Sequence, residues 1–249
     1  MGENGTVERA AVRVARKIVS EIRRRRLRPG TKLASEHVMV AELGVARATV
    51  REALRFLELQ GALRIKAGPG GGPVVSVPGA DHLVSVLSLQ LQFADASFRS
   101  VTEARRSIYP VLAAEAAGNA THQDVETLHQ SVARMRSNVA DSDFMVRELR
   151  RFQELVAAAS RNTVLGLLVN ALHRMSERSG VEFDAQQRRA AVRGHEKVVR
   201  AIESGEPEEA RAVTKKMIDA AARYLERTAP AALKRPVAWI DSDHQGRHE

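Results

Sequence analysis

The chain has 249 residues, enough for one large domain or two modest ones, each with a substantial core. Hydrophobic residues make up 44% of it and aromatic residues only 4%, so its core must be built mainly from Ala, Leu and Val, as in helix bundles. The absence of cysteine excludes disulfides and thiolate metal sites and indicates a reducing compartment. No apolar run has the length of a membrane span or a signal-peptide core, so we expect a cytoplasmic protein with no membrane partner.

The formal charge of +9 is unevenly distributed along the chain. Residues 1–79 contain 15 Lys and Arg against 7 Asp and Glu, whereas residues 80–249 contain 24 against 23. A basic first part followed by a near-neutral remainder predicts a polyanionic partner for the first part alone. The charge by itself does not distinguish DNA, RNA and a membrane surface.

The first predicted helix runs from Thr6 to Arg26, where apolar residues recur at steps of three and four. It ends in the arginine run 23–26, whose cations suit the C-terminal end of a helix dipole and equally suit phosphate contacts. Pro29-Gly30 then predicts a turn.

A helix pair follows this turn. Ser35 is a suitable N-cap for a helix over 36–43, and Gly44 can adopt the left-handed conformation that ends it. The next helix is expected from about Ala46 to Gln60. Its outer side carries three arginines at steps of four: Arg47, Arg51 and Arg55. Two short helices with arginines leading the second are typical of proteins that insert a helix into the major groove of DNA.

Two short β segments, 62–66 and 73–77, are expected around the glycine-rich loop 67–72, and we interpret them as a β-hairpin, or wing. A glycine-rich loop can also cradle phosphate in a nucleotide site. That site requires a strand–loop–helix setting and a GK[ST] ending, and neither is present. A wing lying against a DNA backbone fits this loop better.

The composition changes at residues 78–80, and we place a domain boundary there. Residues 1–79 are predicted to form a winged helix-turn-helix DNA-binding domain, and residues 80–228 an all-helical domain for effector binding and dimerisation. The helices expected in the second domain are 81–94, 100–118, 122–139, 143–159, 163–178, 185–204 and 207–228.

Two features of the helical part depart from a plain bundle. Pro110 predicts a kink or a local helix start. Residues 229–249 are aperiodic and are expected to form a flexible tail. The expected fold class is mostly α: an N-terminal winged helix-turn-helix with a small β-hairpin, followed by an antiparallel all-α bundle of six or seven helices.

The segment LRPGTKLASEHVMVAELGVARATVREALRFLELQGALRIKAGPGGG, residues 27–72, resembles the winged-helix head of GntR-type bacterial transcription regulators. The positions that match the family pattern in spacing are Pro29-Gly30, Leu33, Ser35-Glu36, Leu43-Gly44-Val45, Arg47, Val50 to Leu54, Leu57 and Gly61. Ala46 stands where the family usually has Ser, so the third helix lacks an N-cap hydroxyl worth about 1 kcal/mol. Ala34 stands where the family usually has Pro.

The helical remainder resembles the FadR-type ligand-binding domain called FCD. The residues that carry this resemblance are Glu103 to Arg105, Leu112 to Glu115, Phe152, Ala158 to Asn162, the stretch GHEKVVRAIESGE around His195, and Ala210. Together the two resemblances cover roughly residues 8–228. They imply a homodimeric transcription regulator in which a small molecule controls a DNA-binding head.

Many members of this class bind a divalent metal through D-x-x-x-H on one helix and one His on each of two later helices. Aligned residue by residue, these four positions fall on Leu149, Gln153, His195 and Ala220, the last just after Met217. One imidazole and one amide without a carboxylate cannot hold Zn²⁺ or Ni²⁺ well, so we expect no metal and no cofactor. His173 and His129 are possible substitutes, but a histidine on a bundle helix is more often packed or solvated.

The resemblance implies that a dimer binds a palindromic operator, with the third helix of each copy in the major groove and each wing along the adjacent minor groove. Arg47 and Arg51 can present bidentate forks to guanine edges or clamp phosphates, and Thr49 suits a phosphate or a thymine methyl. The further candidates for contact with the DNA backbone are His37, Arg55, Lys66 and Gly68. For Glu52 we prefer an internal salt bridge that fixes an arginine.

A pocket in the middle of the bundle is expected to bind the effector. The candidate lining residues are Arg105, Tyr109, Leu149, Phe152, Gln153, His195 and Tyr224. The family's arginine at the position of Arg105 faces the cavity, which makes Arg105 the best anchor for an anion. Tyr109 stands where the family commonly has Glu, so this pocket should be less acidic and more apolar. We therefore expect a small acidic or acyl metabolite, such as an acyl-CoA or a fatty acid, to release a repressor from DNA.

Three other functions remain open at this point. An enzyme could be assembled on paper from His195, Glu196 and Asp184, but no nucleophile sits in an activating motif, so we expect no enzymatic activity. A nonspecific nucleic-acid-binding protein would also have a basic head. A metal-dependent regulator of the same family, sensing a small carboxylic acid, is the third.

Overall fold

The computed structural model describes residues 3–68 and 70–241, and side chains from residue 9 onward. Contacts along the chain divide it into two compact units, residues 1–82 and residues 83–249, which we describe separately. Among the described residues, no helix is both long enough and apolar enough to cross a membrane.

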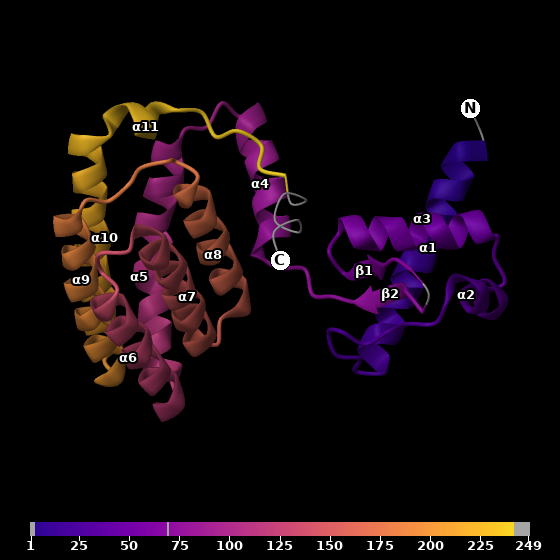
Figure 1. Cartoon of the computed structure of the whole chain (residues 1–249), viewed down its shortest axis with the longest axis horizontal. Coiled ribbons are helices and arrows are strands. Elements are labelled where there is room, and N and C mark those ends of the chain that lie inside the picture. The colour runs from indigo at the N-terminus through magenta and orange to yellow at the C-terminus, as the bar shows by residue number, and fades with distance from the viewer. Residues whose placement is uncertain (1–2, 69, 242–249) are drawn as a thin grey trace. The chain divides into compact units, whose positions relative to one another are not determined.

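The first unit contains three helices and a two-stranded antiparallel sheet (Figure 1). The elements are α1 (Glu3–Arg24), α2 (Glu36–Leu43), α3 (Arg47–Leu59), β1 (Leu63–Lys66) and β2 (Gly72–Val75). Its core forms because the apolar stripe of α1 meets the apolar stripe of α3, which removes both from water. The buried residues of these two stripes are Ala11, Val14, Ala15, Ile18, Val50, Ala53, Leu54 and Leu57.

The helix ends in this unit follow from local chemistry. The Ser35 hydroxyl accepts a hydrogen bond from Val38 N at the start of α2, and Gly44 ends that helix with φ of 63°. Ala46 precedes α3 and provides no side-chain cap, as its sequence predicts. Packing of the inner face therefore stabilises α3 without help from a cap.

The hairpin pairs β1 with β2 in the register Leu63↔Val75 to Lys66↔Gly72. The segment before α2 adds to its free edge, because Val75 N donates to Thr31 O and Leu33 N donates to Pro73 O, both at 2.9 Å. The wing is thus tied to the body of the unit. Pro69, in the predicted wing loop, lies outside the described residues.

The second unit is a helix bundle (Figure 1), which confirms the predicted fold class. Its helices are α4 (Ala80–Phe93, which begins within the first unit), α5 (Phe98–Asn119), α6 (His122–Ser137), α7 (Ser142–Ser160), α8 (Thr163–Glu177), α9 (Ala185–Glu203), α10 (Pro207–Thr228) and α11 (Pro230–Lys234). Helix α5 lies at the centre and packs against α7, α8, α9 and α10. It continues through Pro110, so no helix starts there.

The expectation of a flexible tail differs from what residues 229–241 show. After α11, the chain crosses one end of the bundle to α4 (Figure 1). Val237 is fully buried, and its N–H donates to Ala96 O at 2.8 Å. Trp239 N donates to the Gln92 side chain at 2.6 Å, and Ile240 N donates to the Ser88 hydroxyl at 2.9 Å. After α11 the segment has no helical periodicity because it is extended and is held by side chains of α4. Residues 242–249 lie outside the described part of the chain.

Candidate functional site: an arginine face and a buried cavity

The exposed side of α3 carries the arginines that the sequence indicated. Arg47, Arg51 and Arg55 are all exposed. Glu36, on α2, accepts from two of them: its Oε2 lies 3.4 Å from Arg47 Nε and 3.0 Å from Arg51 Nε. The Arg47 and Arg51 side chains remain 68% and 59% exposed, so the shared carboxylate orients them without covering them.

This arrangement corrects the interpretation of Glu52. Glu52 is exposed and makes no ion pair with any described residue, and the acid that fixes the arginines is Glu36. Glu36 comes from the neighbouring helix, 11 and 15 positions earlier in the chain. No spacing rule within α3 could have identified it.

The other candidates for DNA contact separate into two groups. His37, Lys66 and Gly68 are exposed, and Gly68 has a φ of 90° that favours glycine. Thr49 does not share this surface, because it is only 7% exposed and lies on the inner side of α3. A residue that sequence reasoning missed is Lys32, whose Nζ donates to Gly70 O at 2.6 Å and so holds the wing loop.

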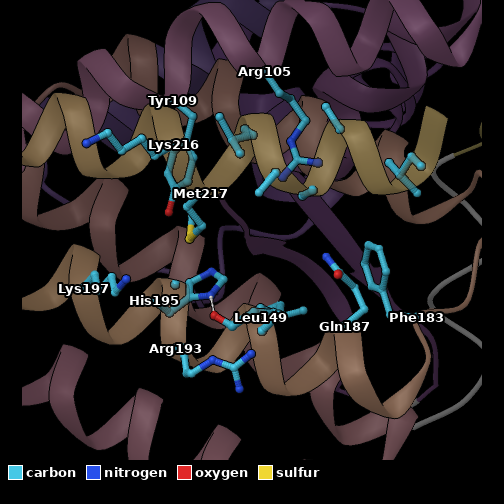
Figure 2. A pocket seen from close by; sticks show the side chains of 18 of the residues that line it. Arg105, Tyr109, Leu149, Phe183, Gln187, Arg193, His195, Lys197, Lys216 and Met217 are labelled. Atoms are coloured by element: carbon cyan, nitrogen blue, oxygen red, sulfur yellow. Dashed lines mark hydrogen bonds between the residues drawn. The ribbon is translucent and has the colours of Figure 1, made fainter. Parts of the chain in front are cut away.

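The second unit contains a cavity of about 540 Å³ between α5, α7, α9 and α10 (Figure 2). Five of the seven predicted effector residues line it: Arg105, Tyr109, Leu149, Gln153 and His195. Phe152 and Tyr224 do not. Phe152 lies fully buried behind the wall, and the Tyr224 hydroxyl donates to Asp184 at 3.0 Å.

The four positions aligned with the metal-binding pattern converge in space. Leu149, Gln153, His195 and Ala220 all line this cavity. Their side chains offer one imidazole nitrogen and one amide and no carboxylate, and the described residues contain no group of three or more His, Cys, Asp or Glu suited to a metal. The residues present therefore do not fit a divalent metal, because two of the four positions have no donor atom.

One wall of the cavity adjoins a partly buried charged network. Arg105 donates to His173 Nδ1 at 3.0 Å, and the other ring nitrogen of His173 lies 3.4 Å from Glu177 Oε1. Arg150 pairs with the same carboxylate. Burial lowers the pKa of His173 to about 4, and the His173 ring and Arg150 hold the pKa of Glu177 at about 2 despite its own partial burial. His173 is thus neutral: its Nδ1 accepts from Arg105, and its Nε2 faces Glu177 without a well-formed hydrogen bond. No group of three or more His, Cys, Asp or Glu suited to a metal forms around it in the described part of the chain.

Arg105 itself has no carboxylate partner among the described residues. Burial lowers the pKa of its guanidinium, but an arginine remains charged in a protein. Its Nε is buried and makes no hydrogen bond, and Figure 2 shows the guanidinium pointing from its helix into the cavity. A buried cation with a free donor favours an anionic ligand.

His195 faces the same cavity from α9. Its Nδ1 lies 2.7 Å from Ala191 O, and its ring packs nearly perpendicular to the Phe152 ring with centroids 4.7 Å apart. Burial lowers the pKa of His195 to about 4. Burial also raises the pKa of the Tyr109 hydroxyl, so both groups are neutral near pH 7.

The rest of the lining is mainly apolar. Phe183 and Met217 are among its apolar side chains (Figure 2). The sequence did not indicate Phe183 as a lining residue, nor the polar and basic side chains of Thr102, Gln187, Arg193, Lys197 and Lys216. Met217 had a signal in the sequence, since it lies one turn before the last aligned metal position. A side cavity of about 290 Å³ shares Arg105 and His173 with the main one, so the arginine stands between two compartments.

Comparisons with known proteins agree with this architecture. The family model "Bacterial regulatory proteins, gntR family" matches residues 10–72, and the FCD domain model matches residues 100–220. A structure of Streptococcus agalactiae GntR superimposes with a TM-score of 0.65 at 21% identity, covering 86% of this chain and 99% of that one, which indicates a shared fold.

Curated relatives are similar over a shorter stretch. The regulator LutR of Bacillus subtilis is 28% identical over 144 residues, which are 58% of this chain and 65% of LutR. The repressor NanR of Cronobacter sakazakii is 30% identical over 146 residues, 57% of this chain and 55% of NanR. The alignments thus span roughly half to two thirds of these relatives. On the two family matches and the fold, the chain belongs to the GntR family of bacterial transcription regulators, a family without enzymatic activity, and its C-terminal part is an FCD domain.

Proposed function

We propose that the protein is a repressor that binds a palindromic DNA operator as a homodimer and is released by a small organic acid. The observation that carries the first half is the exposed row Arg47, Arg51 and Arg55 on the second helix of a helix-turn-helix. The net charge of the first 79 residues supplies the nonspecific attraction to phosphate on which specific reading builds. The related protein NanR is named as a repressor, which supports repression of transcription by this protein too.

The second part of the proposal, release by a small organic acid, rests on Arg105. A buried guanidinium that lacks a carboxylate is stabilised when an anion enters the cavity, and the apolar lining around Met217 and Leu149 can hold a hydrocarbon part. A cavity of about 540 Å³ is within the range of small-molecule sites. A fatty acid or the acyl part of an acyl-CoA has this combination of an acidic or polar end and an apolar chain.

The test of DNA recognition is competition. A sequence is first selected from random DNA by the purified protein, and binding is then measured at physiological salt against excess random DNA. We expect one palindrome to be retained with a preference of at least about a thousandfold. Equal competition by random DNA would show a nonspecific nucleic-acid-binding protein instead.

The test of the effector is release of that DNA by fatty acids, acyl-CoAs and small hydroxy acids, with and without a chelator. We expect an acid to release the wild type and to lose most of its effect on Arg105→Leu. The chelator should change neither result, and a large chelator effect would identify a metal-dependent regulator.

A further inference from the structure

The outer side of α1 carries a second set of basic side chains, separate from the arginines of α3. All are exposed, and they lie on one side of the helix, opposite the buried stripe that starts at Ala11 and ends at Ile18. We call this set the α1 row; its members are Arg9, Arg13, Arg16, Lys17 and Arg23. At a rise of about 1.5 Å per residue, the α1 row extends over about 21 Å.

The charges of the α1 row are not neutralised within the head. None of its five members makes an ion pair with an acid among the side chains that the structure describes. Glu21, the acid that α1 contains from residue 9 onward, pairs with Arg24 and Arg25 instead. Like charges four positions apart, such as Arg9 and Arg13, destabilise a helix. A bound polyanion would remove this repulsion.

The α1 row and the arginines of α3 lie on opposite sides of the head. The buried stripe of α1 packs against the inner face of α3, where Val50 and Leu54 are buried. Each helix therefore directs its basic side chains away from the other, and the axes of two packed helices are already about 8–10 Å apart. A straight duplex that lies along the outer face of α3 cannot reach the α1 row.

The chemistry of the α1 row favours a duplex phosphate backbone over other polyanions. Single-stranded nucleic acid is bound by aromatic side chains on which bases stack, and membranes and protein partners require large apolar side chains beside the cations. Residues 9–24 include no aromatic side chain, and Val19, at the edge of the row, is only 36% exposed. A row about 21 Å long passes about six phosphates of one DNA strand, enough for each of its cations to contact a phosphate.

We propose that the α1 row binds the phosphate backbone of a second DNA duplex. A head that is seated on its operator through α3 then holds another DNA segment through α1, so the protein joins two segments of DNA. The contact is made to phosphates alone, and it is therefore independent of sequence. This proposal rests on the operator-binding role of α3 proposed above and adds a second DNA contact to the same head.

The experiment measures capture of a second duplex by the operator complex. The biotinylated palindrome is fixed on streptavidin beads and saturated with the full-length protein, unbound protein is washed away, and a fluorescent random duplex is added at about 0.1 M salt. Beads that carry the complex should retain at least about tenfold more random duplex than beads that carry the palindrome alone. The affinity for the second duplex should fall steeply with salt, as phosphate binding requires.

A triple variant tests the assignment to the α1 row. Arg13→Gln/Arg16→Gln/Lys17→Gln removes three of its charges and keeps residues that favour a helix, and circular dichroism verifies the fold. Capture should fall at least about tenfold, and the salt slope should decrease by about two to three. Operator affinity should change by less than about threefold, because salt screens charges that lie beyond a Debye length of about 8–10 Å.

The matched control removes three exposed arginines from the second unit. Arg147→Gln/Arg151→Gln/Arg223→Gln loses the same net charge and should keep full capture. An equal loss of capture in both triple variants would mean that net charge alone matters, and it would overturn the proposal.

The remaining outcomes separate this proposal from operator recognition by α3. Failure of the wild type to capture a second duplex, or capture that persists in the α1 variant, overturns the role of the α1 row and leaves operator binding intact. A loss of operator affinity of tenfold or more in the α1 variant alone would assign the row to the operator's own backbone. If no palindrome is selected, the proposed function fails, and capture is then measured with a random duplex fixed on the beads.

Discussion

The Arg105 guanidinium donates to Nδ1 of His173 at 3.0 Å, and the other ring nitrogen of His173 faces Glu177. A cation and a neutral imidazole are thus placed together in the lining of the cavity. The arrangement depends on His173 remaining uncharged, since a second positive charge beside Arg105 would repel it.

The first prediction concerns acid. The pKa of His173 and that of His195 are each lowered from 6.5 to about 4 in the folded protein. The unfolded chain therefore binds more protons between these values, and stability falls as pH drops from about 6.5 to about 4. Each histidine can contribute at most about 3 kcal/mol to this loss. Urea unfolding across this range measures it.

The control for this prediction is a pair of variants. His173→Gln should reduce the loss of unfolding free energy between pH 6.5 and pH 4. His122→Gln, at an exposed position on α6, should leave that loss unchanged. An equal slope in both variants would mean that other groups govern the acid sensitivity.

The second prediction concerns the carboxylate that Arg47 and Arg51 share. Glu36→Gln should free both guanidiniums, raise the affinity for random DNA several-fold and steepen its salt dependence by about one counterion. The ratio of operator to random binding should fall. Because these are exposed ion pairs, stability should change by less than about 1 kcal/mol.

Glu52→Gln is the matched control, since it also removes one negative charge, here from α3, without breaking an ion pair. Filter binding at several salt concentrations compares the two variants. Identical behaviour would show that overall charge matters and that the pairing of Glu36 does not.

The third prediction concerns the segment after α11. Val237 is fully buried against α4 and α5, so Val237→Ala should cost about 1–3 kcal/mol in the free energy of unfolding. Val164→Ala, at a valine 71% exposed, should stay within about 0.5 kcal/mol. Thermal unfolding followed by circular dichroism distinguishes them. A neutral Val237→Ala would mean that this segment does not contribute to the bundle in solution.

The helices could be predicted closely from the sequence because the apolar periodicity and the capping residues indicate the same helix ends. Helix α6 begins at a capping box formed by Thr121 and Asp124, and α10 spans the predicted residues 207–228. Thr49 is a predicted DNA contact that lies instead on the inner side of α3. It stands four residues before Ala53 and eight before Leu57, both buried, and this helical spacing puts it on their face.

Other features could not be predicted from one sequence because they join distant segments. His173 and Arg105 are 68 positions apart, and Glu36 reaches its arginines from another helix. In the segment after α11, backbone N–H groups donate to the side chains of Ser88 and Gln92, about 150 positions earlier. Periodicity reports which face of an element is buried, and it does not report which partner covers that face.

The most direct test of the central claim is operator binding by Arg51→Ala, measured by fluorescence anisotropy on the selected palindrome. The matched control is Arg223→Ala, an exposed arginine on α10. We predict that Arg51→Ala binds the palindrome no better than random DNA while its mass in solution equals that of the wild type, and that Arg223→Ala binds normally. A preference for the palindrome that survives in Arg51→Ala would contradict the assignment of α3 as the helix that reads DNA.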